Sequence, residues 1–202
     1  THPELLEWLA SLLRERGSSK ALHREIMLSA TYQLSSSQHT ENDSKDHTNR
    51  YLWRMNRRRL DVEAFRDAIL FVTGELEPVI GGPSIDPMKN TSRRTLYTQV
   101  NRLERTGDYT VMDFLTTFDF PNPRISVGNR VESTVPQQQL FLLNSTFIAE
   151  RSIRLYTRIK SLVEGEGQEK HVRLAYELLY GRPAADEEVH LALAFLQEAA
   201  KT

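Results

Sequence analysis

The sequence predicts a mainly α protein: a multi-helix domain with long irregular loops and an αα-hairpin near its C-terminal end. Two patterns predict this class. Apolar residues recur three or four positions apart, as at Leu5, Leu9 and Leu12, which is the spacing of one helix face. Glycines such as Gly17 and Gly181 follow the ends of these segments, where helices commonly stop. From these segments we expect about six to eight helices.

The composition limits the classes of function. Of the 202 residues, 39% are hydrophobic and 26% are charged, as in a soluble globular domain that can bury a substantial core. The net charge of −1 gives no sign of a nucleic-acid or membrane-surface binder, and no apolar run is long enough to span a bilayer. The sequence has no cysteine and no two histidines at i, i+4 spacing. We therefore expect no haem, no other cofactor and no tightly bound metal in this chain.

Residues 1–34 predict a helical hairpin. Thr1 and Glu4 fit a capping box at the start of the first helix, and Ser18 precedes the second. Residues 35–49 are polar throughout, so we expect an irregular, solvated loop. The chain starts directly with this helix and shows no leader pattern, from which we expect a piece of a longer protein.

The rest of the chain alternates helices with breaks. Asp61 is suited to open a helix that ends at Gly74, whereas the proline and glycine content of residues 78–92 predicts irregular structure. The segment 95–100 fits either a lone strand or a helix face. Four further helical segments are indicated: 112–117, 136–165 with a break at Asn144-Ser145, 168–180 and 186–196.

We expect a single helical domain over residues 1–202. Its sub-divisions would be the hairpin 1–34, a central motif region 50–163 and a C-terminal hairpin 168–202.

The central stretch, residues 116–145, holds the one catalytic candidate. Asp119 lies between Phe118 and Phe120, whose neighbourhood favours burial of the carboxylate. A buried carboxylate needs a partner, so we expect Asp119 to pair with an arginine from Arg57–Arg59, Arg93-Arg94 or Arg130. If Asp119 instead worked in acid–base catalysis, Glu132 would be the nearest second carboxylate.

The chain also has arginines that no packing argument requires. Their planar fork suits carboxylate, sulfate or phosphate, whereas pairing with carboxylates of the chain itself is the alternative. The candidate anion-binding residues are Arg57, Arg58, Arg59, Arg93, Arg94 and Arg130.

Several stretches resemble a domain of unknown function, DUF1553 of the PSD1 type, that is found in planctomycetes and verrucomicrobia. The matching segments are THPELLEWLA at 1–10, KALHREIMLSATYQLS at 20–35, LWRMNRRRLDVEAFRD at 52–67, RRTLY at 93–97, FDFPNP at 118–123, TVPQQQLFLLNS at 134–145 and LYGRP at 179–183. The sequence departs from the pattern at Ala185, where we would expect a serine or threonine cap.

The resemblance implies an exported, multidomain parent protein in which this domain is C-terminal and accompanies cytochrome-c-like domains. Haem c would then belong to other domains of the parent. The resemblance implies no catalytic residues.

Three functions remain open. The first is a structural or interaction module whose partners are other domains of the parent, including cytochrome-c-like ones. The second is an enzyme or binding domain for an anionic, sulfated or carboxylated polysaccharide at an arginine-rich site. The third, nucleic-acid binding through residues 54–59, conflicts with the net charge of −1.

Overall fold

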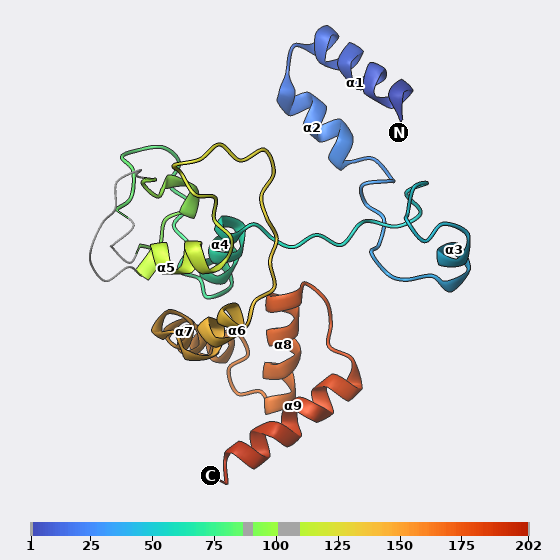
Figure 1. Ribbon diagram of the computed structural model, residues 1–202. Helices are drawn as coiled ribbons and strands as arrows, with labels where there is room; N and C mark the ends of the chain where they lie inside the picture. The colour runs from blue at the N-terminus through green and yellow to red at the C-terminus, as the bar shows by residue number, and fades with distance from the viewer. Residues whose placement is uncertain (1, 87–90, 101–109, 202) are drawn as a thin grey trace. The chain divides into compact units, whose positions relative to one another are not determined.

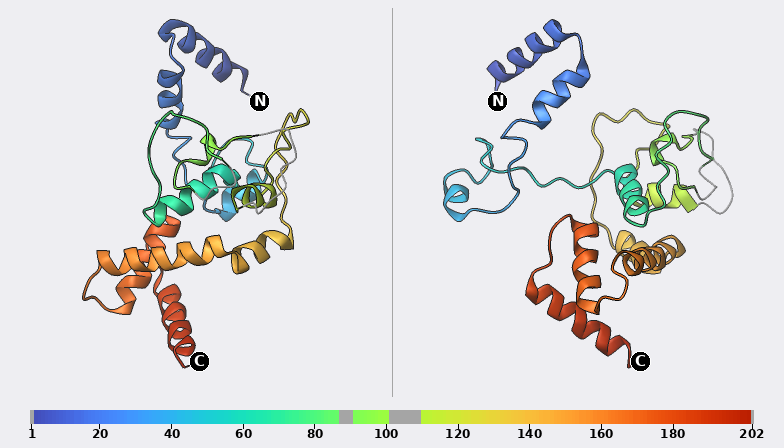
Figure 2. Two further views of the ribbon diagram at one scale, coloured as in Figure 1. Left: turned by 90° about the vertical axis from the view of Figure 1, so that its left-hand side faces the viewer. Right: turned by 180° about the vertical axis from the view of Figure 1, so that it is seen from behind.

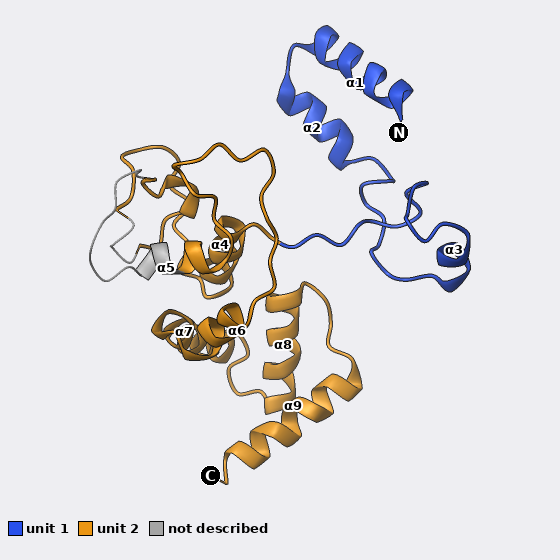
Figure 3. Ribbon diagram, viewed as in Figure 1, with its two compact units in different colours: residues 1–59 blue, residues 60–202 orange. Residues whose placement is uncertain are grey.

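The computed structural model describes residues 2–86, 91–100 and 110–201. The chain divides into two compact units, unit 1 (Thr1–Arg59) and unit 2 (Leu60–Thr202), which Figure 3 colours separately. In the part of the chain that is described, the regular elements are nine α-helices and one 3-10 turn, without a strand. The mainly α prediction is therefore confirmed. The unit boundary falls inside the region 50–163 that the sequence suggested as one sub-division.

Unit 1 begins with the expected hairpin of α1 (Pro3–Arg16) and α2 (Ser19–Met27), which contact each other (Figure 1). Gly17 adopts φ of 58° between them, a left-handed conformation that favours glycine. Ser18 caps α2 by accepting a hydrogen bond from the backbone N–H of Ala21 at 3.2 Å. The N-cap of α1 is His2, without a side-chain cap; the expected cap Thr1 lies outside the described residues.

We expected the polar segment 35–49 to be irregular, but part of it is helical. It contains the short helix α3 (Thr40–Lys45), in which Lys45 lies 2.7 Å from Glu41 one turn earlier. Just after α3, the Asp46 carboxylate accepts hydrogen bonds from the backbone N–H groups of Arg50 and Tyr51. These bonds lower the pKa of Asp46, with that of Tyr51 contributing most. Local polar bonds thus order a segment that has no apolar residue to bury.

Unit 2 is built on an aromatic core. It includes α4 (Val62–Val72), α5 (Thr110–Thr117), α6 (Pro136–Asn144) and α7 (Thr146–Leu162). Buried Phe114 and Phe118 stack with ring centroids 5.0 Å apart, and Phe65, Phe141 and Phe147 surround them. This ring cluster holds α4, α5, α6 and α7 together; Figure 2 shows these helices from two further sides.

The described residues between α4 and residue 100 form a connection with isolated bridges. Glu77 pairs with Arg93 and Ile85 with Thr98, each as one parallel bridge. The segment 95–100, ambiguous from sequence, contains the 3-10 turn η1 (Thr95–Tyr97), and η1 contacts α4. Within 78–92, residues 87–90 lie outside the described residues, and no helix occurs in the described remainder.

The C-terminal αα-hairpin is confirmed. It consists of α8 (Gln168–Tyr180) and α9 (Asp186–Ala199), which pack through Val172, Ala184 and Val189. The departure at Ala185 has a structural answer, because the Glu188 carboxylate accepts the Ala185 backbone N–H at 2.9 Å. A side chain three residues into the helix therefore does part of the capping. None of the helices in the described ranges is both long and apolar enough for a membrane crossing.

Candidate functional site

Asp119 follows α5 and closes a loop. Its backbone has φ of 64°, which is uncommon for a residue with a side chain. Its carboxylate accepts hydrogen bonds from the Ser133 backbone N–H at 2.9 Å and from the Ser133 hydroxyl at 2.6 Å. Asp119 and Ser133 thus clasp the two ends of the irregular segment 120–132, and we call this pair the Asp119 clasp.

Gln138 on α6 contacts the Asp119 clasp. Only 4% of its surface is exposed, and its amide donates to the Thr117 carbonyl at 3.1 Å. The same amide lies 3.4 Å from the Asp119 carboxylate. Because a buried amide must find partners, Gln138 fixes the end of α5 against α6. Both oxygens of Asp119 are therefore occupied by groups that hold the loop.

Arg130 lies within the clasped loop but points to another carboxylate. Its guanidinium donates to both oxygens of Glu63 on α4, each at 2.7 Å, and Asp61 lies 3.8 Å away. The bidentate bond lowers the pKa of Glu63 and raises that of Arg130. The arginine thus ties the loop to the start of α4.

Arg93 and Arg94 also have partners within unit 2. The Arg93 guanidinium donates to the carbonyls of Gly81 and Pro83 and lies 4.7 Å from the centre of the Tyr97 ring. Arg94 pairs with Asp67 at 3.3 Å. Other acceptors therefore engage Arg93, Arg94 and Arg130, three of the arginines expected to pair with Asp119. The pairing of Asp119 with Arg59 stays a prediction.

The three remaining candidates, Arg57, Arg58 and Arg59, lie in unit 1 and are exposed. The guanidinium groups of Arg57 and Arg58 have no ion-pair or hydrogen-bond partner in the part of the chain that is described. Arg58 lines an apolar groove of unit 1.

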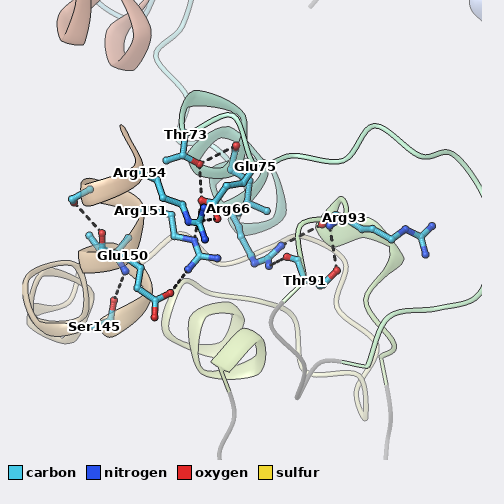
Figure 4. A network of polar contacts seen from close by, with 12 residues as sticks. Arg66, Thr73, Glu75, Thr91, Arg93, Ser145, Glu150, Arg151 and Arg154 are labelled. Atoms are coloured by element: carbon cyan, nitrogen blue, oxygen red, sulfur yellow. Dashed lines mark hydrogen bonds and ion pairs between the residues drawn. The ribbon is translucent and has the colours of Figure 1, made fainter. Parts of the chain in front are cut away.

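The sequence interpretation missed the most buried arginine. Arg66 on α4 is 1% exposed and donates to the Thr91 carbonyl at 2.6 Å and to the Thr95 hydroxyl at 3.1 Å (Figure 4). Burial lowers its pKa to about 10. A signal was present: Val62, Arg66 and Leu70 are four residues apart, so the arginine stands within an apolar face.

A second buried cluster surrounds Glu75, after α4 (Figure 4). Arg151 approaches Glu75 at 3.3 Å and Arg154 approaches it at 3.0 Å, both from α7. The Thr73 hydroxyl donates to the same carboxylate at 2.9 Å, and Arg151 also pairs with Glu150. Charged residues thus bind α7 to the end of α4.

A family model of proteins of unknown function, DUF1553, matches residues 1–196. The chain belongs to this family, PSD1. No curated protein and no solved structure matches the sequence.

The described residues of the PSD1 domain contain no group of three or more histidine, aspartate or glutamate side chains that could hold a metal ion. In the candidate site itself, Asp119 binds a serine and Glu132 is exposed. The printed contacts of Asp119, Gln138 and Arg130 fix loops and helix ends to one another.

Proposed function

We propose that this PSD1 domain is a structural or interaction module of a larger exported protein, acting beside cytochrome-c-like electron-transfer domains. One observation carries the proposal: three of the candidate arginines, Arg93, Arg94 and Arg130, are already engaged by acceptors of the chain. Haem would be supplied by the neighbouring domains. The role of this domain is to offer a surface that these domains bind.

The energetics of the arginine pairs support this reading. An anionic substrate at Arg130 would have to displace Glu63, which makes two charge-assisted bonds in a partly buried setting. At Arg93 it would have to break the bonds to two backbone carbonyls, which would then lose their partner. Substrate binding at either place would oppose the fold.

The test is a binding experiment between the full chain and separately purified cytochrome-c-like domains of PSD1 proteins. We expect calorimetry to show a saturable complex. Cross-links between the two proteins should be confined to one surface of the chain. Turnover of a polysaccharide by the chain alone, abolished by Asp119→Asn, would overturn the proposal.

The polysaccharide alternative rests on Arg57 and Arg58, whose guanidinium groups have no partner among the described residues. Two exposed cations in a row can bind sulfate or carboxylate groups of a glycan. Binding of a sulfated polysaccharide that Arg57→Ala/Arg58→Ala abolishes and Arg130→Ala leaves unchanged would favour this second function.

A further inference from the structure

Unit 1 contains an apolar groove of about 780 Å³. Its walls come from α1, α2, the turns after α2 and the segment that includes Leu52 and Met55. The apolar side chains on which the groove depends are Leu5, Trp8, Leu9, Ile26, Tyr32 and Met55. A concave surface of this volume and character is typical of a binding site.

Little of the apolar surface of unit 1 is buried, and the groove includes part of what stays exposed. Among the described residues of unit 1, Leu12 is the one buried hydrophobic side chain. Trp8 is 52% exposed and Leu5 is 50% exposed. A two-helix hairpin of this kind gains little from burying its own side chains, so a protein element that covers the groove would supply the missing core.

The carboxylates that line the groove have favourable partners within unit 1, whereas its arginines have no carboxylate partner among the described residues. Its carboxylates are compensated: Glu25 pairs with Arg16 at 3.5 Å, and Glu4 lies in the first turn of α1, where the helix dipole favours a negative charge. Its arginines have no carboxylate partner in the part of the chain that is described. The Arg54 guanidinium lies over the Trp53 ring, 5.1 Å from its centre, and Arg54 Nε has no hydrogen-bond partner. The Arg58 guanidinium has none among the described residues.

We propose that this groove receives an amphipathic helix of a partner protein, with an apolar stripe for Trp8 and its neighbours and carboxylates that meet Arg54 and Arg58. The apolar lining selects a stripe at i, i+3 or i+4, and i+7, as in other helix-in-groove interfaces. The unpaired arginines select acidic flanks. This inference rests on the proposed function, and it specifies the chemistry of one partner surface.

The experiment uses the full chain and a fluorescein-labelled helical peptide of about four turns, with leucine on one stripe and glutamate on both flanks. Fluorescence anisotropy should show saturable binding. Arg54→Glu/Arg58→Glu should weaken it by about tenfold or more, because both new carboxylates repel the peptide. Trp8→Ala should abolish it by removing the apolar anchor.

Two controls keep the result specific. Arg57→Glu changes an exposed neighbour that does not line the groove, so it should leave the affinity within about twofold. A peptide with lysine in place of every glutamate should bind more weakly than the acidic one to the wild type and regain affinity for Arg54→Glu/Arg58→Glu.

Three outcomes would overturn the inference: equal binding of acidic and lysine peptides, binding of a fatty acid but of neither peptide, or a self-associated chain in which Trp8 is already covered. A folded chain, verified by circular dichroism, that binds neither peptide would also do so. Complex formation with cytochrome-c-like domains is measured separately, so the proposed function stands or fails without this result.

Discussion

The two units of this PSD1 domain use similar residues to opposite effect. Unit 2 buries a cluster of phenylalanines and matches its arginines to carboxylates, carbonyls and hydroxyls of the same unit. Unit 1 leaves Trp8 and its neighbours at the surface of a groove and leaves Arg54 and Arg58 without such partners in the described residues. Unit 2 therefore contains the interactions that stabilise a fold, whereas unit 1 displays the apolar and cationic groups to which we assign partner recognition.

The comparison also separates two roles of arginine in this chain. The residue serves as a structural connector where an acceptor lies within reach across the fold, as Glu63 does for Arg130. It is available for recognition where the local chain offers none, as at Arg58. The density of arginines in the sequence does not distinguish the two cases, since both kinds occur within the short stretch from Arg54 to Arg66.

The largest expected effect is at the core of unit 2. Phe114→Ala should reduce the free energy of unfolding by about 3–5 kcal/mol, because it removes a fully buried ring from the phenylalanine cluster. Leu6→Ala in unit 1 should change it by less than about 0.5 kcal/mol, because Leu6 is 70% exposed. Urea denaturation of both variants measures the contrast, and equal losses would remove the distinction between the units.

Next comes the buried arginine. Arg66→Met should cost roughly 2–4 kcal/mol of stability, because the Thr91 carbonyl and the Thr95 hydroxyl lose their partner inside the protein. The matched control is Arg154→Met on α7, an exposed member of the Glu75 cluster, which should cost less than about 1 kcal/mol. Thermal unfolding, followed by circular dichroism, compares the stability losses of the two variants. A larger loss for Arg154→Met would show that burial does not decide which arginine contributes more stability.

The Asp119 clasp should have an intermediate effect. Asp119→Ala is expected to cost about 1–3 kcal/mol, the range for lost hydrogen bonds to a partly buried carboxylate. Asp119→Asn should cost less, since asparagine tolerates positive φ and can still accept from Ser133. A melting temperature equal to or above that of the wild type would indicate a strained site and revive the catalytic role of Asp119.

The smallest effect depends on pH. The bond from Arg182, together with the Ala185 N–H, lowers the pKa of Glu188 from 4.5 to about 2. The stabilisation is thus fully present above pH 4.5 and is lost as the pH falls through about 2. Glu188→Gln should melt below the wild type near neutral pH, with the difference vanishing towards pH 2. For Glu187→Gln, at the exposed neighbour, the difference in melting temperature from the wild type should not depend on pH. If both variants showed the same pH dependence, the pairing of Glu188 would not be its cause.

The sequence alone determined most of the helices and their breaks, but not α3 or the 3-10 turn η1. Apolar spacing and capping residues predicted α1, α2, α4 and the C-terminal hairpin, and the break at Asn144 is real because the Ser145 hydroxyl caps α7. These features depend on neighbours within one or two turns. The resemblance of nearly the whole chain likewise led to the family, which the matched range 1–196 confirms.

Only the tertiary structure decided which charged and polar groups meet. Arg130 and Glu63 are 67 positions apart, and Arg66 and Thr95 are 29 apart, so no local pattern pairs them. The same holds for the Asp119 carboxylate, which accepts from Ser133, 14 positions along the chain, while Arg130 reaches Glu63. Periodicity fixes which face of a helix is apolar, whereas long-range packing fixes what that face, and each arginine on it, will touch.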